Sequence, residues 1–336
     1  MRTLADAFVR LRGLRLPVFH ALNAWRWLFE ANPRLDALGR YAWRQLVSRL
    51  PLRAHLLVGD PDAESPLLLP VDSRALVTTV KDAKLEHFDD VVRAAELLAS
   101  GPDVERVFDA MTRGGDPFDF HLALNPRDIR DSRNAVFVQF AMQPRLVGLV
   151  QKYLGMPCRL KEVRVMLDRP TASEPRASQK WHRDPDDWMT VGVFVYLRDV
   201  DTNAAPFCYI PSHRCGSLHG RVGSFRRFSR WQTLPDAMME TLIPREHWVE
   251  VTGATGTATF VDIAACYHRV KPAVSSRRLS LQLVFTSAFT RMEMTERTAR
   301  LFQAESERKY ASESPEYVVA SASRVHEHHR VRSDHE

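Results

Sequence analysis

The chain has 336 residues, of which 45% are hydrophobic and 26% are charged, a composition typical of a globular protein with one large domain or two modest ones. The formal net charge of +6 comes mostly from scattered arginines, so it excludes a typical nucleic-acid module and indicates a mild preference for anionic small molecules. Four cysteines without a CxxC pair disfavour a disulfide framework, and no segment has the apolar run of a membrane span or signal peptide, so we expect a reduced, cytoplasmic protein.

The first part of the chain, residues 1–125, predicts a helical region that packs on a later core. Apolar residues recur at helical spacing from Thr3 to about Leu50. A stretch rich in Pro and Asp then breaks the pattern, and two further helices are expected near Asp89–Ala99 and Asp103–Thr112.

The middle of the chain, residues 126–290, predicts the core. It opens with a helix across 135–155 that is split or kinked at Pro144 and ended by Gly155. Short segments rich in β-branched and aromatic residues follow, with Pro, Gly, Asn and Asp between them. Strands of this kind favour a mainly β protein with α elaboration, built on a double-stranded β-helix, the jelly-roll or cupin-like barrel. The segments are 159–170, 190–200, 206–211, 255–263 and 277–287.

Two further regions flank or interrupt this core. Residues 216–248 separate two strands and predict a lid-like excursion over the barrel mouth. The arginines of this excursion either contact an acidic substrate or form a solvated charged face. Residues 291–336 are charged and predict a helix followed by a frayed tail. The arginines in question are Arg221, Arg226, Arg227 and Arg230.

The segment QKWHRDPDDW contains His182 and Asp184, two positions apart. If the segment is a strand, both side chains point the same way, as adjacent metal ligands must. Two histidines and one carboxylate suit non-haem Fe(II), because three facial ligands leave positions open for substrate and oxygen. The second histidine must then come from a distant strand. His268, in GTATFVDIAACYHRV, is the candidate.

Iron sites that activate O2 commonly use a co-substrate that supplies two electrons, and 2-oxoglutarate does so by losing CO2. Its far carboxylate is expected to bind a guanidinium inside the barrel. In SSRRLSLQLVFTS the leucines share one face that should pack on helices, so Arg278 faces the interior and Arg277 reaches solvent. Ser280 shares the face of Arg278, and Tyr196 is a further candidate contact of the co-substrate. Arg164 either faces the same pocket or lies on the surface.

The order of these residues, H-x-D, a distant H and then R about ten residues later, resembles the phytanoyl-CoA dioxygenase family of Fe(II)/2-oxoglutarate oxygenases. WHRDPDD, VFVYLRDVDTNAAPFCYIPSHR and GTATFVDIAACYHRVKP with the following RRLSL are similar to the family's metal strand, central stretch and distal strands. The resemblance covers about Lys161 to Thr286. It implies that His182, Asp184 and His268 bind iron and that Arg278 holds 2-oxoglutarate.

The chain departs from the family pattern at two turns. Residues 203–206 read N-A-A-P where the family usually reads N-G-P, and residues 211–213 read P-S-H where it reads P-G-S-H. These changes alter turns near the barrel mouth and leave the ligands intact. Asp184 itself favours hydroxylation, since related halogenases have a small residue at this position.

We therefore expect an Fe(II)- and 2-oxoglutarate-dependent dioxygenase that hydroxylates an unactivated C–H bond of a small-molecule substrate, acidic or lipid-like. Two alternatives use the same barrel. One is a non-catalytic binding or regulatory module, which would not bind iron. The other is a metal-dependent cupin-type enzyme that does not use 2-oxoglutarate, against which the Arg-x-Ser strand argues.

Overall fold

The computed structural model describes residues 38–41, 67–125, 129, 132–156, 158–184, 187–215 and 233–287. Three sequence predictions lie outside these residues: most of the helix expected over residues 3–50, the four arginines of the excursion, and the C-terminal helix and tail.

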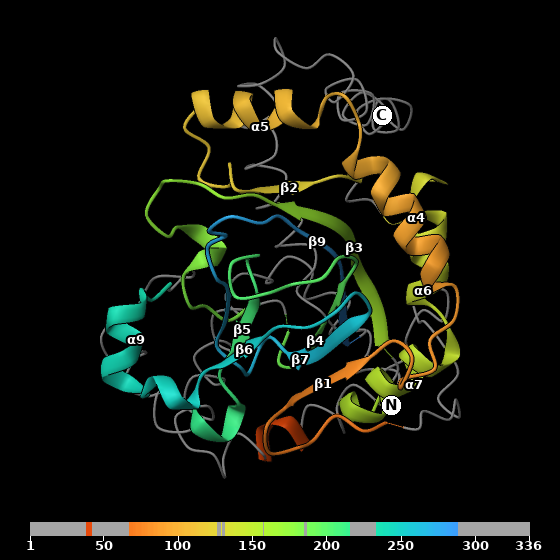
Figure 1. Cartoon of the computed structure of the whole chain (residues 1–336). Helices are drawn as coiled ribbons and strands as arrows, with labels where there is room; N and C mark the ends of the chain where they lie inside the picture. The colour runs from red at the N-terminus through yellow and green to blue at the C-terminus, as the bar shows by residue number, and fades with distance from the viewer. Residues whose placement is uncertain are drawn as a thin grey trace, which may run out of the picture.

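Two antiparallel sheets form the centre of the molecule (Figure 1). In order across the sheet, the strands of the large one are β1 (Ala75–Thr79), β7 (Thr257–Asp262), β4 (Thr190–Tyr196), β9 (Arg278–Ser287), β3 (Cys158–Asp168) and β2 (His121–Ala123). Those of the small one are β6 (Val249–Val251), β5 (Phe207–Tyr209) and β8 (His268–Val270). An isolated bridge between His182 and His268 adds the segment before β4 to the free edge of β8.

From β3 onward the chain winds between the two sheets. It passes from β3 to the His182 bridge, back to β4, across to β5 and β6, and then through β7, β8 and β9. This winding of paired antiparallel strands is that of a double-stranded β-helix, so the predicted fold class is confirmed.

The helices lie mainly on the outer face of the large sheet. Figure 1 shows α4, α6 and α7 beside β3, with α9 on the opposite side of the molecule near β5 and β6. The helices predicted near residues 89–99 and 103–112 are confirmed, as is the split at Pro144. Gly155 ends the last of them in a left-handed conformation, φ 68°, which glycine adopts without steric cost. The α-helices are α4 (Phe88–Ala99), α5 (Val104–Arg113), α6 (Ala135–Ala141), α7 (Pro144–Leu154) and α9 (Asp236–Leu242), and the short 3-10 turns are Ser132–Asn134, Ala177–Gln179, Ser212–Arg214 and Arg245–His247.

Strand β9 separates the helix-facing core from the barrel interior. Leu279, Leu281 and Leu283 are fully buried in the cluster that also contains helix residues such as Phe137 of α6. Val284, on the other face, belongs to a second cluster with residues of β5 and β6. Each buried leucine stabilises the fold by about 1.5–3 kcal/mol, which fixes the register of β9 and therefore which side chains face inward.

Two strands of the large sheet come from the region in which the sequence analysis expected only helices. Strand β1 pairs with β7, and β2 pairs with β3. Both are short, and both are stabilised by partners distant in sequence, which hydrophobic periodicity does not register.

A buried ion pair attaches residues 38–41 to the large sheet. Arg40 donates from Nη1 to Asp262 Oδ2 at 2.7 Å, and Tyr153 donates its hydroxyl to the same oxygen at 2.6 Å. Asp262 Oδ1 accepts backbone bonds from Thr190 and Ala264. A segment far away in sequence is thus anchored where β7 ends.

In the described part of the chain, no helix combines the length and apolar character needed to cross a membrane.

Candidate metal centre

His182, Asp184 and His268 converge on one point of the barrel. One possible ligand atom from each lies within 4.8 Å of the others. Asp184 Oδ1 is 3.8 Å from Nε2 of His182 and 3.9 Å from Nε2 of His268. Among the residues that the structure describes, this is the one such group of three. Two imidazoles and a carboxylate at this spacing can contact a single metal ion.

Backbone pairing places the two histidines side by side. His182 and His268 exchange backbone hydrogen bonds of 3.0 and 2.9 Å, and the Asp184 N–H donates to the Ile263 carbonyl at 2.9 Å. The shared direction expected for His182 and Asp184 assumed that their segment is a strand. In the structure only an isolated bridge forms at His182, and Asp184 follows it in irregular backbone.

The second nitrogen of each imidazole holds its ring in place. His182 Nδ1 lies 2.8 Å from the Lys180 carbonyl oxygen, and His268 Nδ1 lies 3.2 Å from that of Cys266. A carbonyl only accepts, so Nδ1 carries a proton in both rings and Nε2 is the nitrogen available to a metal. This is the tautomer that a metal ligand requires.

The surroundings shift the titration of two of these groups. Burial lowers the pKa of His268 well below its ordinary value, and the nearby His182 lowers it further. Burial raises the pKa of Asp184, although His182, Lys161 and Arg164 each oppose that rise. The imidazole of His268 therefore stays neutral, and the buried carboxylate of Asp184 is costly to ionise without a nearby positive charge. A bound cation would supply that charge, so the site favours one.

Arg278 and Ser280 face the barrel interior from β9. Both residues are 1% exposed. Arg278 Nε donates to Asp168 Oδ2 at 2.9 Å, whereas Nη2, at 2.8 Å from the same oxygen, has no well-directed hydrogen bond. Ser280 Oγ is also buried without a partner. Arg278 Nη2 and Ser280 Oγ are thus two polar atoms on the same face of β9 that could donate to acceptor oxygens.

The hydroxyl of Tyr196 is already bonded inside the fold. It donates its one proton to the Val251 carbonyl at 2.7 Å and accepts from the Phe207 N–H at 3.0 Å. Burial raises the Tyr196 pKa to about 12 even with Arg278 nearby. The residue therefore links β4 to the small sheet, and the predicted contact with a co-substrate would require it to release Val251.

The two other arginines of the sequence analysis separate clearly. Arg164 lies opposite Gln282 in the β3–β9 register, with its Nη2 2.7 Å from Glu162 Oε2. Its side chain is 26% exposed. Arg277 instead pairs with Glu105 at the protein surface, through bonds of 2.5 and 2.9 Å.

Sequence reasoning missed Asp168 and His121. The register aligns Asp168 with Arg278 on one side and with His121 on the other. His121 Nδ1 lies 2.6 Å from Asp168 Oδ1. No local motif marks these residues, because the three positions meet only through sheet pairing.

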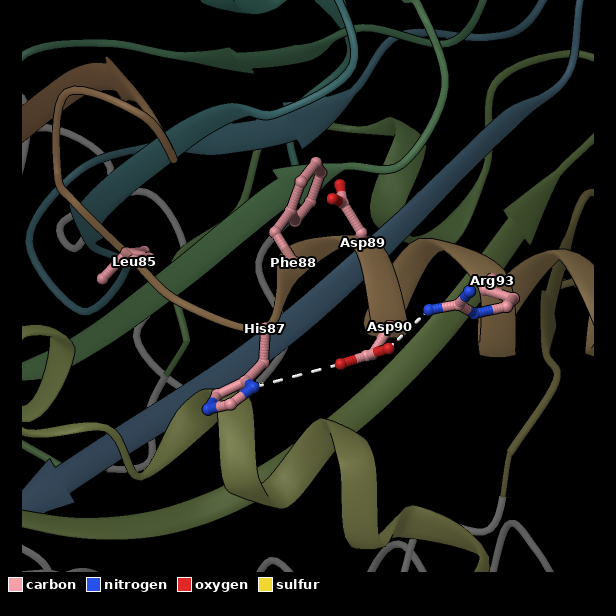
Figure 2. Close-up of a pocket in the computed structure, with 6 residues that line it drawn as sticks. All are labelled: Leu85, His87, Phe88, Asp89, Asp90 and Arg93. Carbon is pink, nitrogen blue, oxygen red and sulfur yellow. Dashed lines mark hydrogen bonds and ion pairs between the residues drawn. The ribbon is translucent and has the colours of Figure 1, made fainter.

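Two surface pockets lie apart from this centre. The first has a volume of about 490 Å³ and lies at the N-terminal end of α4. Figure 2 shows His87, Asp90 and Arg93 in a row there, with Asp90 in contact with the other two. The second, of about 470 Å³, lies beside the small sheet and includes Trp248 and Arg269. Neither pocket contains a residue predicted to bind iron or 2-oxoglutarate.

No protein-family model matches the sequence, and neither does any curated protein. Solved structures with a similar chain path include the epimerase SnoN in complex with Fe3+, alpha-ketoglutarate and nogalamycin RO, at 19% identity and a TM-score of 0.42 over 65% of this chain and 81% of that one. EctD from S. alaskensis with 2-oxoglutarate and 5-hydroxyectoine matches at 17% identity and 0.45, over 70% and 86%.

HygX from Streptomyces hygroscopicus with nickel and 2-oxoglutarate matches at 15% identity and a TM-score of 0.42, over 65% of this chain and 84% of that one. All three of these structures contain 2-oxoglutarate.

Proposed function

We propose that the protein is an Fe(II)- and 2-oxoglutarate-dependent dioxygenase that hydroxylates an unactivated C–H bond of a small molecule. The observation that carries the proposal is the convergence of His182, Asp184 and His268, with both Nε2 atoms directed at one carboxylate. Three donors of this type leave room around a metal for other ligands.

The same interior face offers a place for the co-substrate. Arg278 Nη2 and Ser280 Oγ are two buried groups without good partners, two residues apart on β9. A carboxylate would accept from both and relieve the cost of leaving them unpaired. This pair of donors favours an enzyme that uses 2-oxoglutarate over a metal enzyme that uses no such co-substrate.

Each element has a separate part in the proposed reaction. His182, Asp184 and His268 hold Fe(II), while Arg278 and Ser280 orient the far carboxylate of 2-oxoglutarate. When bound, the iron with 2-oxoglutarate and O2 supplies the oxidising power, one oxygen atom going to the substrate and the other to succinate, with release of CO2. The leucine face of β9 and the helices behind it exclude water from the other side of the sheet. Arg164 faces the same interior but is paired with Glu162, so its charge does not select between an acidic and a lipid-like substrate.

An anaerobic titration tests the proposal. Adding 2-oxoglutarate to the Fe(II)-loaded protein should produce the weak visible charge-transfer band of the iron chelate. His268→Ala should abolish the band because it removes a ligand. Arg278→Ala should weaken 2-oxoglutarate binding by about 100-fold, since charge-assisted hydrogen bonds contribute roughly 1.5–3 kcal/mol each.

Arg277→Ala is the matched control, because it removes the neighbouring arginine at the surface. It should leave both the band and the affinity unchanged. Ser280→Ala gives a milder loss and serves if Arg278→Ala does not fold. Iron binding without any band in the wild-type protein would overturn the dioxygenase in favour of another metal enzyme, and failure to bind iron would favour a non-catalytic module.

A further inference from the structure

The Arg278 guanidinium is held from the side by a buried carboxylate of its own chain. Asp168 is 1% exposed and faces Arg278 directly across the β3–β9 pairing. It uses one oxygen, Oδ2, toward Nε and Nη2. A guanidinium has a second edge, formed by its two Nη atoms, and on this edge Nη2 is buried without a hydrogen-bond partner.

The other oxygen of Asp168 is also occupied. His121 Nδ1 lies 2.6 Å from Oδ1, and the His121 side chain is 12% exposed. An ionised carboxylate only accepts, so the imidazole donates from Nδ1. Burial raises the pKa of Asp168, but the charge of Arg278 and then His121 outweigh it, so the pKa lies below its ordinary value. The carboxylate is thus fixed at both oxygens before any ligand arrives.

We propose that Asp168, held by His121, is a positioning residue that fixes the Arg278 guanidinium so that Nη2 is directed at the carboxylate of 2-oxoglutarate. This inference rests on the proposed function and concerns how its co-substrate is held. Asp168 acts through Arg278, since its carboxylate oxygens contact Arg278 and His121. Without the Asp168 carboxylate, the Arg278 side chain would populate several rotamers. Binding of 2-oxoglutarate would then have to select the one that contacts its carboxylate, which lowers affinity.

His121 provides a test that leaves the buried ion pair intact. His121→Ala removes the donor to Oδ1, whereas His121→Asn restores an N–H donor at about the position of Nδ1. Calorimetric titration of 2-oxoglutarate into the anaerobic Fe(II)-loaded protein measures affinity directly. We expect His121→Ala to weaken binding by about 5- to 10-fold and His121→Asn to stay within about twofold of wild type. Asp168→Asn should weaken it by more than tenfold.

Three further readouts separate positioning from a general loss of structure. Fe(II) affinity should not change in the His121 variants. The rate of 2-oxoglutarate decarboxylation at saturating 2-oxoglutarate should match that of the wild type, while the KM for 2-oxoglutarate should rise. In an Arg278→Ala background, His121→Ala should have no additional effect on 2-oxoglutarate affinity, because Asp168 no longer has a guanidinium to position.

The possible failures are distinguishable. If the wild-type protein binds 2-oxoglutarate but folded His121→Ala binds it equally well, the positioning role is wrong and the proposed function stands. Tighter binding by Asp168→Asn would show that Asp168 competes with the co-substrate, and it too would overturn the inference. Absence of 2-oxoglutarate binding to the iron-loaded wild type would overturn both proposals.

Discussion

The two histidines of the candidate metal centre are oriented by backbone atoms. Each Nδ1 bonds to the carbonyl of the residue two positions earlier, Lys180 or Cys266. Ring orientation therefore depends on the local chain path and on the His182–His268 bridge, with no need for a neighbouring carboxylate. Side-chain substitutions around the site should alter substrate binding more readily than ligand geometry.

Asp168 gives a prediction about acid stability. Its native pKa lies below that of the unfolded chain, because burial, which raises it, is outweighed by Arg278 and His121. A lowered native pKa stabilises the fold above the unfolded pKa of about 3.9, and this contribution is lost as the pH falls through the lower native value. The difference in unfolding free energy between wild type and Asp168→Asn should therefore shrink below about pH 4. Urea unfolding at several pH values measures it, and a pH-independent difference would contradict the assignment.

Residue-level prediction succeeded where strand alternation was enough. The alternation separates Arg278 from Arg277, and the structure buries the first and leaves the second in a surface ion pair. It could not identify Asp168, which lies 110 positions from Arg278 in the sequence. Sheet register, which brings the two together, depends on packing across the whole core.

At the scale of elements, β3, β4, β5, β7 and β9 all fall within segments that the sequence analysis predicted as strands, apart from one residue at the start of β3. These strands are apolar or alternate over several residues, so the local signal is strong. Strand β2 has three residues and β1 has five, and the two strands form the opposite edges of the large sheet. Their stability comes from pairing with β3 and β7, which no local pattern encodes.

The turn before β5 yields a second prediction. Ala205 lies in the N-A-A-P turn, where the family that the sequence resembles usually has glycine. Its φ is 55°, a left-handed conformation that costs an alanine about 1 kcal/mol or more. Ala204, beside it, is equally buried, at 1% exposed, but is not left-handed. Both changes to glycine remove one buried methyl group. We expect Ala205→Gly to be more stable than Ala204→Gly by about 1 kcal/mol in chemical denaturation. Equal stabilities would show that the turn is unstrained.

At the scale of the whole molecule, the helical and β parts share one core. The cluster behind the large sheet combines residues of α4, α6 and α7 with those of β3, β4 and β9. The ion pair between Arg40 and Asp262 also attaches residues 38–41 to the large sheet. The sequence predicted that helices buttress the barrel, because their apolar faces need a partner. Which helix contacts which strand follows from long-range packing, and the sequence pattern does not contain it.

The four cysteines are distributed across this architecture, and all are free and buried. Cys158 lies in β3 of the large sheet and Cys208 in β5 of the small one. Burial raises the pKa of both thiols to about 12, that of Cys215 to about 11, and that of Cys266 well above its ordinary value. The thiolate is the reactive species, so these cysteines are nearly inert in the folded chain.

Alkylation can therefore report on opening of the fold. We expect iodoacetamide at pH 8 to label the unfolded chain in urea at four cysteines and the native protein only at the rate of local or global unfolding, as mass spectrometry of the intact chain would show. Rapid labelling of one thiol in native protein would contradict its burial. Cys158 and Cys208 belong to different sheets. Their separate labelling rates, measured on peptides of the labelled chain, reveal whether the two halves of the barrel open together or one at a time.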